Sequence, residues 1–479
     1  MSSENRFYCG GEWRSGTNDL PVTNPYNGET VGTTSFATED DLEHATTRAV
    51  AAFEETRRLQ TYERAAILQQ LADGLANRQE EFVRLMTREA GKPVKDSRVE
   101  VLRGVFTLQT AVEEAKRIGG ETIPLDLMAS SAGRFGITRR FPIGPIAGIS
   151  PFNFPLNLAL HKVAPAIASG NTIVLKVPTH DPLTMLTFAE LVDQTDLPKG
   201  AVSVMPMDRE VGDKLVTDER YTLLSFTGSP GVGWDMKNRA GKKKVVLELG
   251  GNAGVIVDRN SDVRLAAQRC RVGAFAYAGQ VCISVQRIYI HQERMDEFIE
   301  ILLDEIGNMH VGDPLDEKTD LGPMIDDKAA ARTEEWIEAA TSQGAKVLCG
   351  GKADGRFFQP TVITNAPPDS FVCSREAFAP LVNVFPFSDF SDALTNINDS
   401  DFGLQAGVFT HSLEHALQAF ESIEAGGVII NDVPTYRIDH MPYGGVKDSG
   451  LSREGLRYAI EDMTEPRLAV FNRVPDPNA

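Results

Sequence analysis

The chain has 479 residues, of which 42% are hydrophobic and 24% charged, and its 67 acidic and 48 basic side chains give a net charge of −19. This size and composition are typical of a soluble enzyme with two or three lobes, and the acidic balance disfavours nucleic acid and anionic membrane surfaces as partners. Five widely spaced cysteines without a C-x-x-C, and an N-terminus without an apolar signal core, favour a reducing, cytoplasmic location.

The first quarter of the chain is predicted to be mainly helical. Amphipathic patterns over residues 39–58, 61–90 and 93–118 predict three helices, the last with Pro93 in its first turn. The most apolar stretch, residues 142–160, contains four prolines and cannot form a membrane-spanning helix.

From residue 134 onward, short β-rich runs alternate with helical stretches. The first series of predicted strands covers residues 146–149, 172–175, 201–205, 222–226 and 245–247. The second series consists of a strand at 253–257, a helix at 262–277, a strand at 284–291 and a strand at 426–431 whose Val-Ile-Ile run should be buried. This alternation predicts two α/β units with parallel sheets, one for a cofactor and one for catalysis.

Two further segments, residues 134–141 and 466–471, alternate like exposed or pairing strands. They could cross to another subunit or form an ordinary edge hairpin, and the pattern alone favours neither.

A thiol, a carboxylate and a side-chain amide each lie among small or turn-forming residues. Cys282 follows Ala-Gly-Gln in a loop after a predicted helix, where a thiol can be exposed, although most free cysteines are buried hydrophobes. A helix terminus or positive neighbour would be needed to enrich its thiolate. Glu248 ends a predicted strand before two glycines, and Asn153 lies between two prolines. A thiolate can attack a carbonyl, an amide can hold the oxyanion, and a carboxylate can activate water. A solvated carboxylate and a loop-bridging asparagine are the alternatives.

The sequence has no complete G-x-G-x-x-G, but a glycine-rich turn at 226–233 follows a predicted strand and opens a helix. Gly228 permits the turn, Ser229 should cap the helix, and the free N–H groups can face a phosphate, although a plain connection has the same pattern. Lys176, at a strand end, could bind ribose hydroxyls or a phosphate, or be a surface lysine.

One metal-like pattern is also present. His411 and His415 with Glu414 match H-x-x-E-H. Nothing else in the sequence suggests zinc, so we expect a solvated helix and no metal site.

Together these motifs resemble those of the aldehyde dehydrogenase superfamily, from about residue 24 to 466. The matching segments are Pro-Phe-Asn-Phe-Pro at 151–155, Phe-Thr-Gly-Ser at 226–229, Glu-Leu-Gly-Gly at 248–251, Gly-Gln-Val-Cys at 279–282, Glu-Ala-Phe-Ala-Pro at 376–380 and Pro-Tyr-Gly-Gly-Val-Lys at 442–447. Asn-Asp-Val-Pro-Thr at 431–435 and Asp-His-Met-Pro-Tyr at 439–443 are similar to the lactaldehyde dehydrogenase-like branch, which acts on short, often hydroxylated or anionic aldehydes.

The resemblance implies an aldehyde dehydrogenase-like α/β fold in three parts. These are a Rossmann-like NAD(P)-binding domain (1–119 and 142–249), an α/β catalytic domain (250–454) and a β-hairpin oligomerisation arm (120–141 and 455–479). It also implies a homodimer or homotetramer.

The resemblance assigns roles to individual residues. It implies Cys282 as nucleophile, Asn153 with the Cys282 backbone N–H as oxyanion hole, and Glu248 as general base. The implied cofactor contacts are Lys176, Thr179, Gly228, Ser229, Gly233, Leu249, Glu376 and Phe378. NAD-preferring members often carry Glu where this chain has Thr179; without that carboxylate nothing repels a 2′-phosphate, so NAD and NADP are both permissible. Ala379 stands where the family more often has Gly.

The implied substrate contacts are Arg103, His161, Arg437 and His440. The arginines could bind a carboxylate, sulfonate or phosphate tail, or lie on the surface. Phosphonoacetaldehyde-oxidising relatives carry His and Arg where this chain has Phe154 and Val281, which disfavours that substrate.

The expected reaction is oxidation of a lactaldehyde- or glyceraldehyde-like aldehyde to the acid through a Cys282 thioester, hydrolysed by water that Glu248 activates. A coenzyme-A-acylating enzyme and a catalytically silent binding protein on the same fold are the alternatives. The presence of Glu248 favours hydrolysis, and the three intact catalytic residues favour an enzyme.

Overall fold

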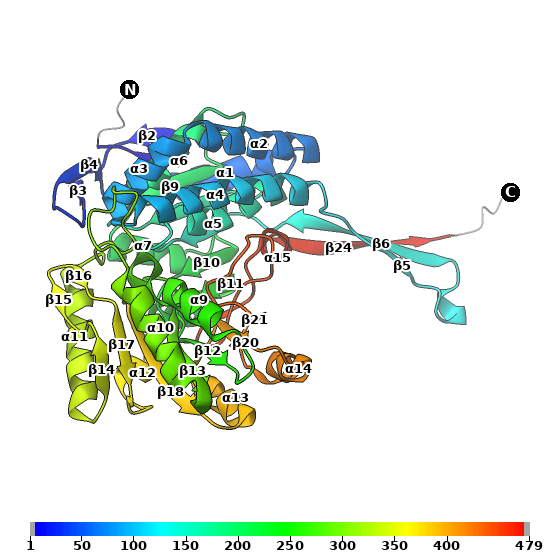
Figure 1. Ribbon diagram of the computed structural model, residues 1–479. Helices are drawn as coiled ribbons and strands as arrows, with labels where there is room; N and C mark the ends of the chain where they lie inside the picture. The colour runs from blue at the N-terminus through cyan, green and yellow to red at the C-terminus, as the bar shows by residue number, and fades with distance from the viewer. Residues whose placement is uncertain (1–4, 474–479) are drawn as a thin grey trace, which may run out of the picture.

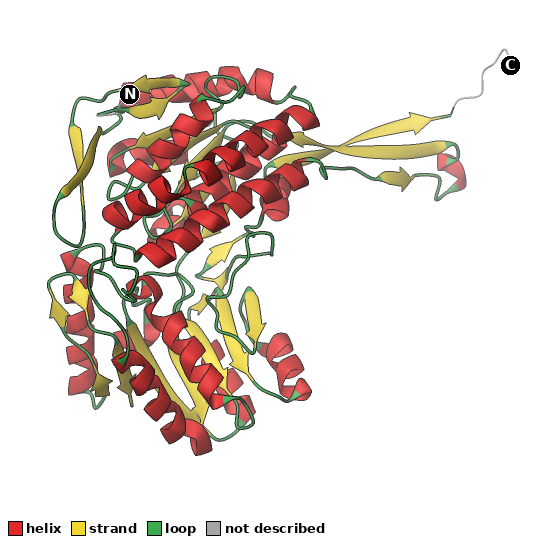
Figure 2. Ribbon diagram, turned by 45° about the horizontal axis from the view of Figure 1, so that its top comes forward, coloured by secondary structure: helices red, strands yellow, loops and turns green. Residues whose placement is uncertain are grey.

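The computed structural model describes residues 5–473, which form two α/β lobes and a projecting arm (Figure 1). The lobes lie one above the other in Figure 1 and the arm extends away from both, as the turned view in Figure 2 also shows. Among the described residues, no helix is both long and apolar enough to cross a membrane. The predicted α/β fold class is confirmed.

The first lobe is built on an eight-stranded sheet. Its strands, in spatial order, are β2 (Glu12–Arg14), β1 (Phe7–Cys9), β9 (Val202–Pro206), β8 (Ile173–Val177), β7 (Ile146–Ile149), β10 (Leu223–Thr227), β11 (Lys244–Glu248) and β23 (Gly450–Leu451). The strands from β9 to β11 are parallel, as predicted. The chain steps from β7 out to β9 and then returns to β10 on the other side of β7, so the strand order reverses between β7 and β10. The loops at the carboxyl ends of these two strands therefore flank the crevice where open α/β sheets bind ligands.

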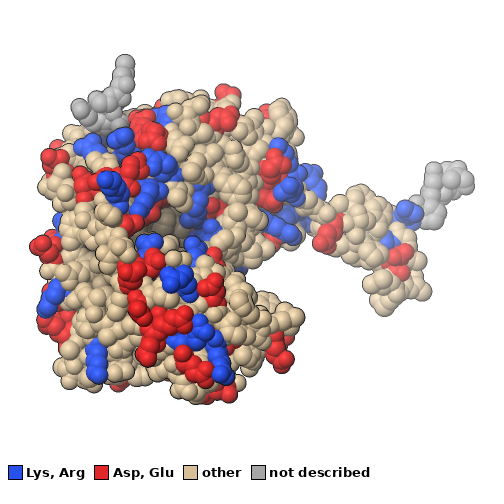
Figure 3. All heavy atoms as spheres, in the orientation of Figure 1, with Lys and Arg blue, Asp and Glu red and all other residues tan. Residues whose placement is uncertain are grey.

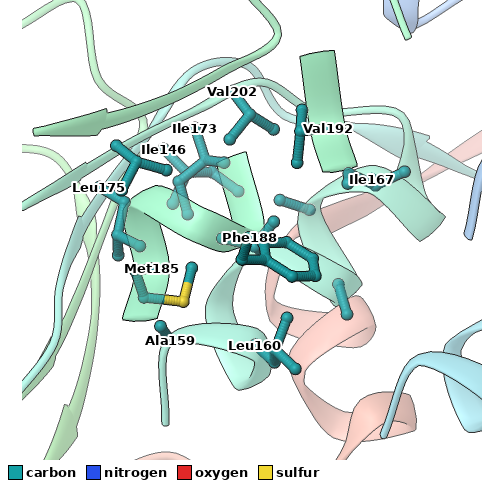
Figure 4. Close-up of a cluster of buried hydrophobic side chains, with 14 of the residues drawn as sticks. Ile146, Ala159, Leu160, Ile167, Ile173, Leu175, Met185, Phe188, Val192 and Val202 are labelled. Atoms are coloured by element: carbon teal, nitrogen blue, oxygen red, sulfur yellow. The ribbon is translucent and has the colours of Figure 1, made fainter. Parts of the chain in front are cut away.

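Helices cover both faces of this sheet. They are α1 (Glu39–Thr56), α2 (Thr61–Asn77), α3 (Gln79–Ala90), α4 (Val94–Ala115), α5 (Asn157–Ser169), α6 (Leu183–Asp193), α7 (Arg209–Thr217), α8 (Pro230–Arg239) and α15 (Leu456–Asp462). Figure 4 shows part of the core, where Ile146 and Ile173 of the sheet meet Leu160 of α5 and Phe188 of α6. Each such side chain contributes about 1.5–3 kcal/mol by leaving water. Every residue of α5 is buried, so this helix fixes the crevice loop that precedes it.

The single helix predicted over residues 61–90 was wrong, because the chain forms two helices there. Arg78 leaves the helical conformation (φ −106°, ψ 19°), and its guanidinium binds Glu81 and Glu190. The break lets α3 turn its apolar face toward α6, a requirement of tertiary packing that periodicity does not reveal.

The second lobe contains a seven-stranded sheet. Its strands, in spatial order, are β14 (Lys346–Cys349), β17 (Thr361–Thr364), β18 (Leu381–Phe387), β13 (Val285–His291), β12 (Ala253–Val257), β20 (Gln405–Phe409) and β21 (Gly427–Ile430). Its helices are α9 (Val263–Phe275), α10 (Met295–Gly307), α11 (Asp327–Ser342), α12 (Phe371–Ser374), α13 (Phe390–Asn398) and α14 (Leu413–Ser422). The strands from β17 to β21 are parallel, which confirms the second predicted series.

The expectation that the Val-Ile-Ile run at 428–430 is buried was wrong. This run forms β21 at the edge of the sheet, where Val428 and Ile429 are half-buried and Ile430 is exposed. A continuous apolar run is typical of a strand covered on both faces, but it does not tell a central strand from an edge.

The two sheets present opposite ends of their strands to each other. In the first lobe Glu248 ends β11 and the loop with Asn153 follows β7, so carboxyl ends face the interface. In the second lobe Cys282 precedes β13 and Phe378 precedes β18, so amino ends face it. Groups from both lobes can therefore meet between the sheets.

The arm consists of β5 (Thr122–Pro124), β6 (Arg134–Pro142) and β24 (Thr464–Asn472), in the order β24-β6-β5. The predicted strands at 134–141 and 466–471 pair with each other, with Leu468 opposite Thr138. The remaining short strands are β3 (Asp19–Thr23), β4 (Thr30–Ser35), β15 (Ala353–Asp354), β16 (Phe357–Phe358), β19 (Phe402–Gly403) and β22 (Val446–Lys447).

Candidate active site

Cys282, Glu248 and Asn153 line one cavity of about 500 Å³ between the lobes. Figure 3 shows that the molecule is hollowed between its lobes on this face and that Lys and Arg side chains border the hollow. The structure thus brings together three residues that lie as far as 129 positions apart in the sequence, counted from Asn153 to Cys282.

The backbone before Cys282 is in a conformation that side chains rarely adopt. Tyr277 (φ 46°, ψ 45°) and Ala278 (φ 53°, ψ 33°) are left-handed, and Gly279 follows at φ 69°. Each left-handed non-glycine residue costs about 1–3 kcal/mol. A Cβ at Gly279 would lie 2.1 Å from the carbonyl oxygen of Ala379. The turn ends α9 at Phe275, two residues earlier than predicted, and brings Cys282 to the cavity.

Two buried contacts hold this turn. The Tyr277 hydroxyl donates to the carbonyl of Ala90 (2.9 Å), and the side-chain oxygen of Gln280 accepts from the N–H of Ile325 (2.9 Å). The strain is therefore maintained by packing against α3 and the second lobe, so the sulfur keeps a fixed position.

The Asn153 amide is fixed but keeps a free donor. Its Nδ2 donates one hydrogen to the carbonyl of Gln280 (2.9 Å), and its own backbone carbonyl accepts from Nζ of Lys92 (2.6 Å). Because an amide NH₂ carries two hydrogens, one remains for an oxyanion in the cavity.

Glu248 is buried, and both of its carboxylate oxygens lack a hydrogen-bond partner among the described residues. Burial, reinforced by the charge of Glu454, raises the pKa of Glu248 well above its usual range. A carboxylate with a raised pKa is a stronger base than one in water, which suits proton abstraction near neutral pH.

The sulfur of Cys282 is not poised as a thiolate by a helix terminus. Burial raises the pKa of the Cys282 thiol to about 11, although a hydrogen bond from Tyr443 and the charge of Arg437 lower it. The thiol is therefore mostly protonated at neutral pH, and a base must remove its proton before attack.

Two glycines after Glu248 allow a carboxylate and a backbone to approach closely. A Cβ at Gly250 would lie 2.4 Å from Oε2 of Glu376, and one at Gly251 would lie 2.2 Å from the carbonyl oxygen of Cys282. The N–H of Gly251 donates to Oε1 of Glu376 (3.0 Å). This pair therefore connects the predicted base, the nucleophile loop and a predicted cofactor contact.

The larger cavity fits a dinucleotide. Of the predicted cofactor contacts, its walls include Gly228, Ser229, Leu249, Glu376 and Phe378. Ser229 stands at the N-cap of α8, but its side chain makes no capping hydrogen bond, so that part of the expectation was wrong. The first-turn N–H groups of α8 consequently have no side-chain cap and can bind a phosphate. Glu376 presents a carboxylate at the wall of this cavity.

Three predicted cofactor residues lie outside these walls. Gly233 lets α8 pack on the sheet, because a Cβ there would lie 2.4 Å from Cδ2 of Leu249. Lys176 is half-buried at the carboxyl side of β8, with its stem against Gly212, and Thr179 is half-buried just beyond.

A second cavity of about 250 Å³ adjoins the first, and Cys282 and Leu158 line both. Of the predicted substrate residues, Arg103 and Arg437 line this smaller cavity. His161 does not: it is buried in α5 with Nε2 2.9 Å from Oδ1 of Asp439. His440 is exposed and packs edge-on against Phe106, also outside these walls.

The two cavity arginines are anchored by carboxylates but keep free donors. Arg103 donates from Nε and Nη2 to Asp439 (3.2 and 2.7 Å), and Arg437 donates from Nη2 to Glu454 (3.0 Å). Among the described residues Nη1 of Arg103 makes no hydrogen bond, and the buried Nε of Arg437 has no partner. Nη1 of Arg103 is therefore available to an anion, and the charge of Arg437 lies on the same cavity wall.

Several functional neighbours were not identified from the sequence. Lys162 of α5 donates to Thr227 (2.7 Å) and lies 3.4 Å from Glu454, and Tyr443 lies 3.1 Å from the Cys282 sulfur. Lys162 follows Leu-Ala-Leu-His in an apolar helix, and a charge in such a pattern is a signal that could have been used. Tyr443 belongs to the Pro-Tyr-Gly-Gly-Val-Lys motif, but it was assigned no role from the sequence.

The H-x-x-E-H residues do not converge. His411 precedes α14, while Nδ1 of His415 is 2.7 Å from Asp258. Within residues 5–473, no group of three or more His, Cys, Asp or Glu side chains is arranged to hold a metal ion.

The chain is similar to known proteins over its whole described length. The family model described as "Aldehyde dehydrogenase family" matches residues 13–469. The 3-sulfolactaldehyde dehydrogenase of Priestia aryabhattai is 44% identical over 97% of this chain and 98% of that protein.

Two solved structures are similar throughout. Aldehyde dehydrogenase 21 from Physcomitrella patens, in complex with the reaction product succinate, has a TM-score of 0.97 and 44% identity over 99% of each chain. Glyceraldehyde-3-phosphate dehydrogenase from Methanocaldococcus jannaschii, complexed with NADP, has a TM-score of 0.92 and 37% identity, covering 95% of this chain and 100% of that one.

Proposed function

Because this chain belongs to the aldehyde dehydrogenase family and to its lactaldehyde dehydrogenase-like branch, we propose that it oxidises a short aldehyde with an anionic tail to the acid. It is an NAD(P)-dependent enzyme. The observation that carries the proposal is the position of Cys282, whose side chain lines both the nucleotide-sized cavity and the smaller cavity with two arginines.

In the proposed reaction, Cys282 loses its proton to a base and its sulfur bonds to the carbonyl carbon. The free amide hydrogen of Asn153 and the backbone N–H of Cys282 hold the oxyanion. A nicotinamide cofactor, held by residues such as Ser229, Glu376 and Phe378, would supply the acceptor for the hydride that leaves the substrate carbon. Oxidation leaves a thioester on Cys282, and Glu248 takes a proton from the water that hydrolyses it, which releases the acid and the thiol.

An aldehyde panel assayed with NAD and with NADP tests this function. We expect one acid per reduced cofactor, and one equivalent of iodoacetamide on Cys282 should stop turnover. Acyl-coenzyme-A production, with no acid formed in its absence, would show the acylating alternative. No turnover of any aldehyde would support the silent binding protein.

The anionic tail is supported by the walls of the smaller cavity and by the relatives. The similar proteins are named for a sulfonated and a phosphorylated aldehyde, and one structure holds succinate. Nη1 of Arg103 would bind such a tail beside the charge of Arg437, and guanidinium groups pair well with carboxylate, sulfonate or phosphate.

Arg103→Leu tests the tail. We expect a rise in KM of about 10- to 100-fold for sulfonated or carboxylated aldehydes, as a charge-assisted hydrogen bond is worth about 1.5–3 kcal/mol, and little change for propanal. Arg98→Leu, on the same helix α4 but outside both cavity walls, is the matched control. Equal losses on charged and neutral aldehydes would reject the idea.

We further propose the domain division expected from the sequence, with β23 and α15 assigned instead to the first lobe, whose sheet and core they join, and a cytoplasmic homodimer or homotetramer. The arm supports assembly, since Leu468, Val470 and Phe471 of β24 are exposed, as are Leu413 and Phe420 of α14. Free cysteines support a reducing compartment. Light scattering should give two or four subunits for the wild type and a smaller species for Leu468→Glu; a wild-type monomer would contradict this.

A further inference from the structure

The residue in contact with the nucleophile is Tyr443. Its hydroxyl lies 3.1 Å from the sulfur of Cys282, its side chain is 3% exposed, and it lines the smaller cavity. Among the residues in the walls of the two cavities, it is the one with a hydrogen bond to the sulfur. None of the roles assigned above uses this contact.

The direction of this hydrogen bond depends on the state of the sulfur. While Cys282 is a thiol, either group can donate to the other. Once the sulfur is a thiolate it can only accept, and the phenol must donate. Burial raises the pKa of Tyr443 well above its usual range, so the phenol keeps its proton and remains a donor. The contact therefore stabilises the thiolate more than the thiol.

One contact fixes the ring of Tyr443 and another fixes its backbone. The Arg437 guanidinium lies 3.6 Å from the ring centroid, and the Tyr443 backbone N–H donates to the carbonyl of Glu454 (3.0 Å). Glu454 in turn fixes Arg437. A cation over the ring draws electron density from the π-system, which makes the phenolic O–H a better donor.

The residue after Tyr443, Gly444, packs closely against Glu248. A Cβ at Gly444 would lie 2.8 Å from Oε1 of Glu248. One loop thus supplies a donor for the sulfur and packs against the carboxylate that stands ready as base. A change at Tyr443 must therefore be small enough to leave this loop in place.

We propose that Tyr443 is a catalytic residue that donates its hydroxyl hydrogen to the sulfur of Cys282 and stabilises the thiolate that attacks the aldehyde. The proposal rests on Cys282 being the nucleophile. The proton leaving the sulfur passes to solvent in the cavity, and Tyr443 keeps its own proton throughout.

Other charges also act on this sulfur. The groups that act most directly on it are Arg437, Tyr443, Glu376 and Glu248. The other charged and titratable residues of the two cavity walls are Lys92, Asp96, Glu100, Arg103, Arg269, Tyr277, Asp326, Lys328 and Arg332. Since Tyr443→Phe leaves all of these in place, a change in thiol reactivity can be assigned to the missing hydroxyl.

The test is the pH dependence of Cys282 alkylation by iodoacetamide in the cofactor-free enzyme, followed by mass spectrometry. For Tyr443→Phe we expect the rate between pH 7 and 10 to fall by about tenfold or more at each pH, as for loss of a hydrogen bond to a charged group. The curve should keep its slope and shift to higher pH. Tyr436→Phe, an exposed tyrosine of the same loop, should match the wild type.

Identical pH profiles for Tyr443→Phe and the wild type would overturn the proposal. Thermal unfolding shows whether the variant is folded, and Tyr443→Met, which also lacks a donor, should reproduce the shift if Tyr443→Phe is unstable. Alkylation needs no aldehyde, so an enzyme that fails on every aldehyde tested would refute the proposed function and leave this result standing.

Discussion

The two cavities that meet at Cys282 differ in whether their key charged side chains have partners. In the larger cavity the Glu248 oxygens have no partner among the described residues. Around the smaller cavity the two arginines are paired, Arg103 with Asp439 and Arg437 with Glu454, while Oδ2 of Asp96 has no partner among the described residues. A buried charged group without a partner lowers the stability of the fold but has a perturbed pKa that suits catalysis. A paired group costs less stability and holds its side chain in place. The unpaired Glu248 carboxylate and the paired arginines therefore line adjacent cavities, and Cys282 lines both.

The pKa shifts follow the same division. Burial alone would raise the pKa of Asp439, but His161 and Arg103 hold it well below its usual range. Burial would likewise raise that of Glu454, yet Lys162, His161 and Arg437 bring it to about 2. Glu248, which has no such partner, is raised.

The largest effect should come from removing the sulfur. Cys282→Ser should lower kcat by more than about 10³-fold, because a serine hydroxyl is a far weaker nucleophile without an adjacent base in contact. Thermal unfolding should change little, since the unpaired site contributes reactivity. If Cys282→Ser kept substantial activity and the burst of reduced cofactor, another residue would be the nucleophile.

Glu248→Gln should separate the two stages. Hydrolysis should slow by about 10²–10⁴-fold, as for loss of a general base, while one equivalent of reduced cofactor per subunit still forms in a stopped-flow burst. The variant should also unfold at a higher temperature than the wild type at pH 8, because it no longer buries an unpaired carboxylate. Wild-type steady-state turnover would remove Glu248 from the mechanism.

Loss of the buried Lys92–Glu100 ion pair should lower both the stability of the fold and kcat. Lys92 pairs with Glu100, whose Oε1 accepts from the N–H groups of Leu156 and Asn157 at the start of α5. Lys92→Met leaves Glu100 buried without its cation, which costs about 3–5 kcal/mol, and frees the carbonyl of Asn153, so kcat should fall by about 10–100-fold through the looser oxyanion hole.

The double variant Lys92→Met with Glu100→Gln is the control for this pair. Denaturant unfolding should show it to be less destabilised than Lys92→Met alone, because no unpaired charge remains. If the double variant were as unstable as the sum of both single variants, the pair would not be coupled.

The smallest effect is a gain in stability of the variant Glu376→Gln over the wild type, which grows as the pH rises. Burial raises the pKa of Glu376 to about 7, above its unfolded value near 4.5. The folded state therefore binds a proton that the unfolded state releases, and stability falls as pH rises from about 4.5 to 7. Glu376→Gln should match the wild-type melting temperature at pH 4.5 and exceed it by a few degrees at pH 8. A constant difference across this range would contradict the raised pKa.

Local patterns predicted most of the elements. The strand at 253–257 matches β12, and the helices at 39–58 and 93–118 end within three residues of α1 and α4. Periodicity reports which faces are covered, so it identified strands and helices but missed the break at Arg78 and the edge position of β21.

The candidate site was predictable as far as its motifs extend. Cys282, Glu248 and Asn153 were identified and lie on one cavity. The partners of the arginines were not, because Arg103 and Asp439 are 336 positions apart and no local signal links them. The left-handed turn at Tyr277 was missed because tertiary contacts impose it on residues that do not favour it.

Cys282 and Leu158 separate the two cavities, since among residues 5–473 these two belong to the walls of both. Any influence of one bound molecule on the affinity for the other passes most directly through these two side chains. By thermodynamic reciprocity, the factor by which nucleotide tightens or weakens aldehyde binding equals the factor by which aldehyde alters nucleotide binding. Leu158 is thus a position at which cooperativity between the two ligands could be tuned by side-chain volume without exchange of a reacting group.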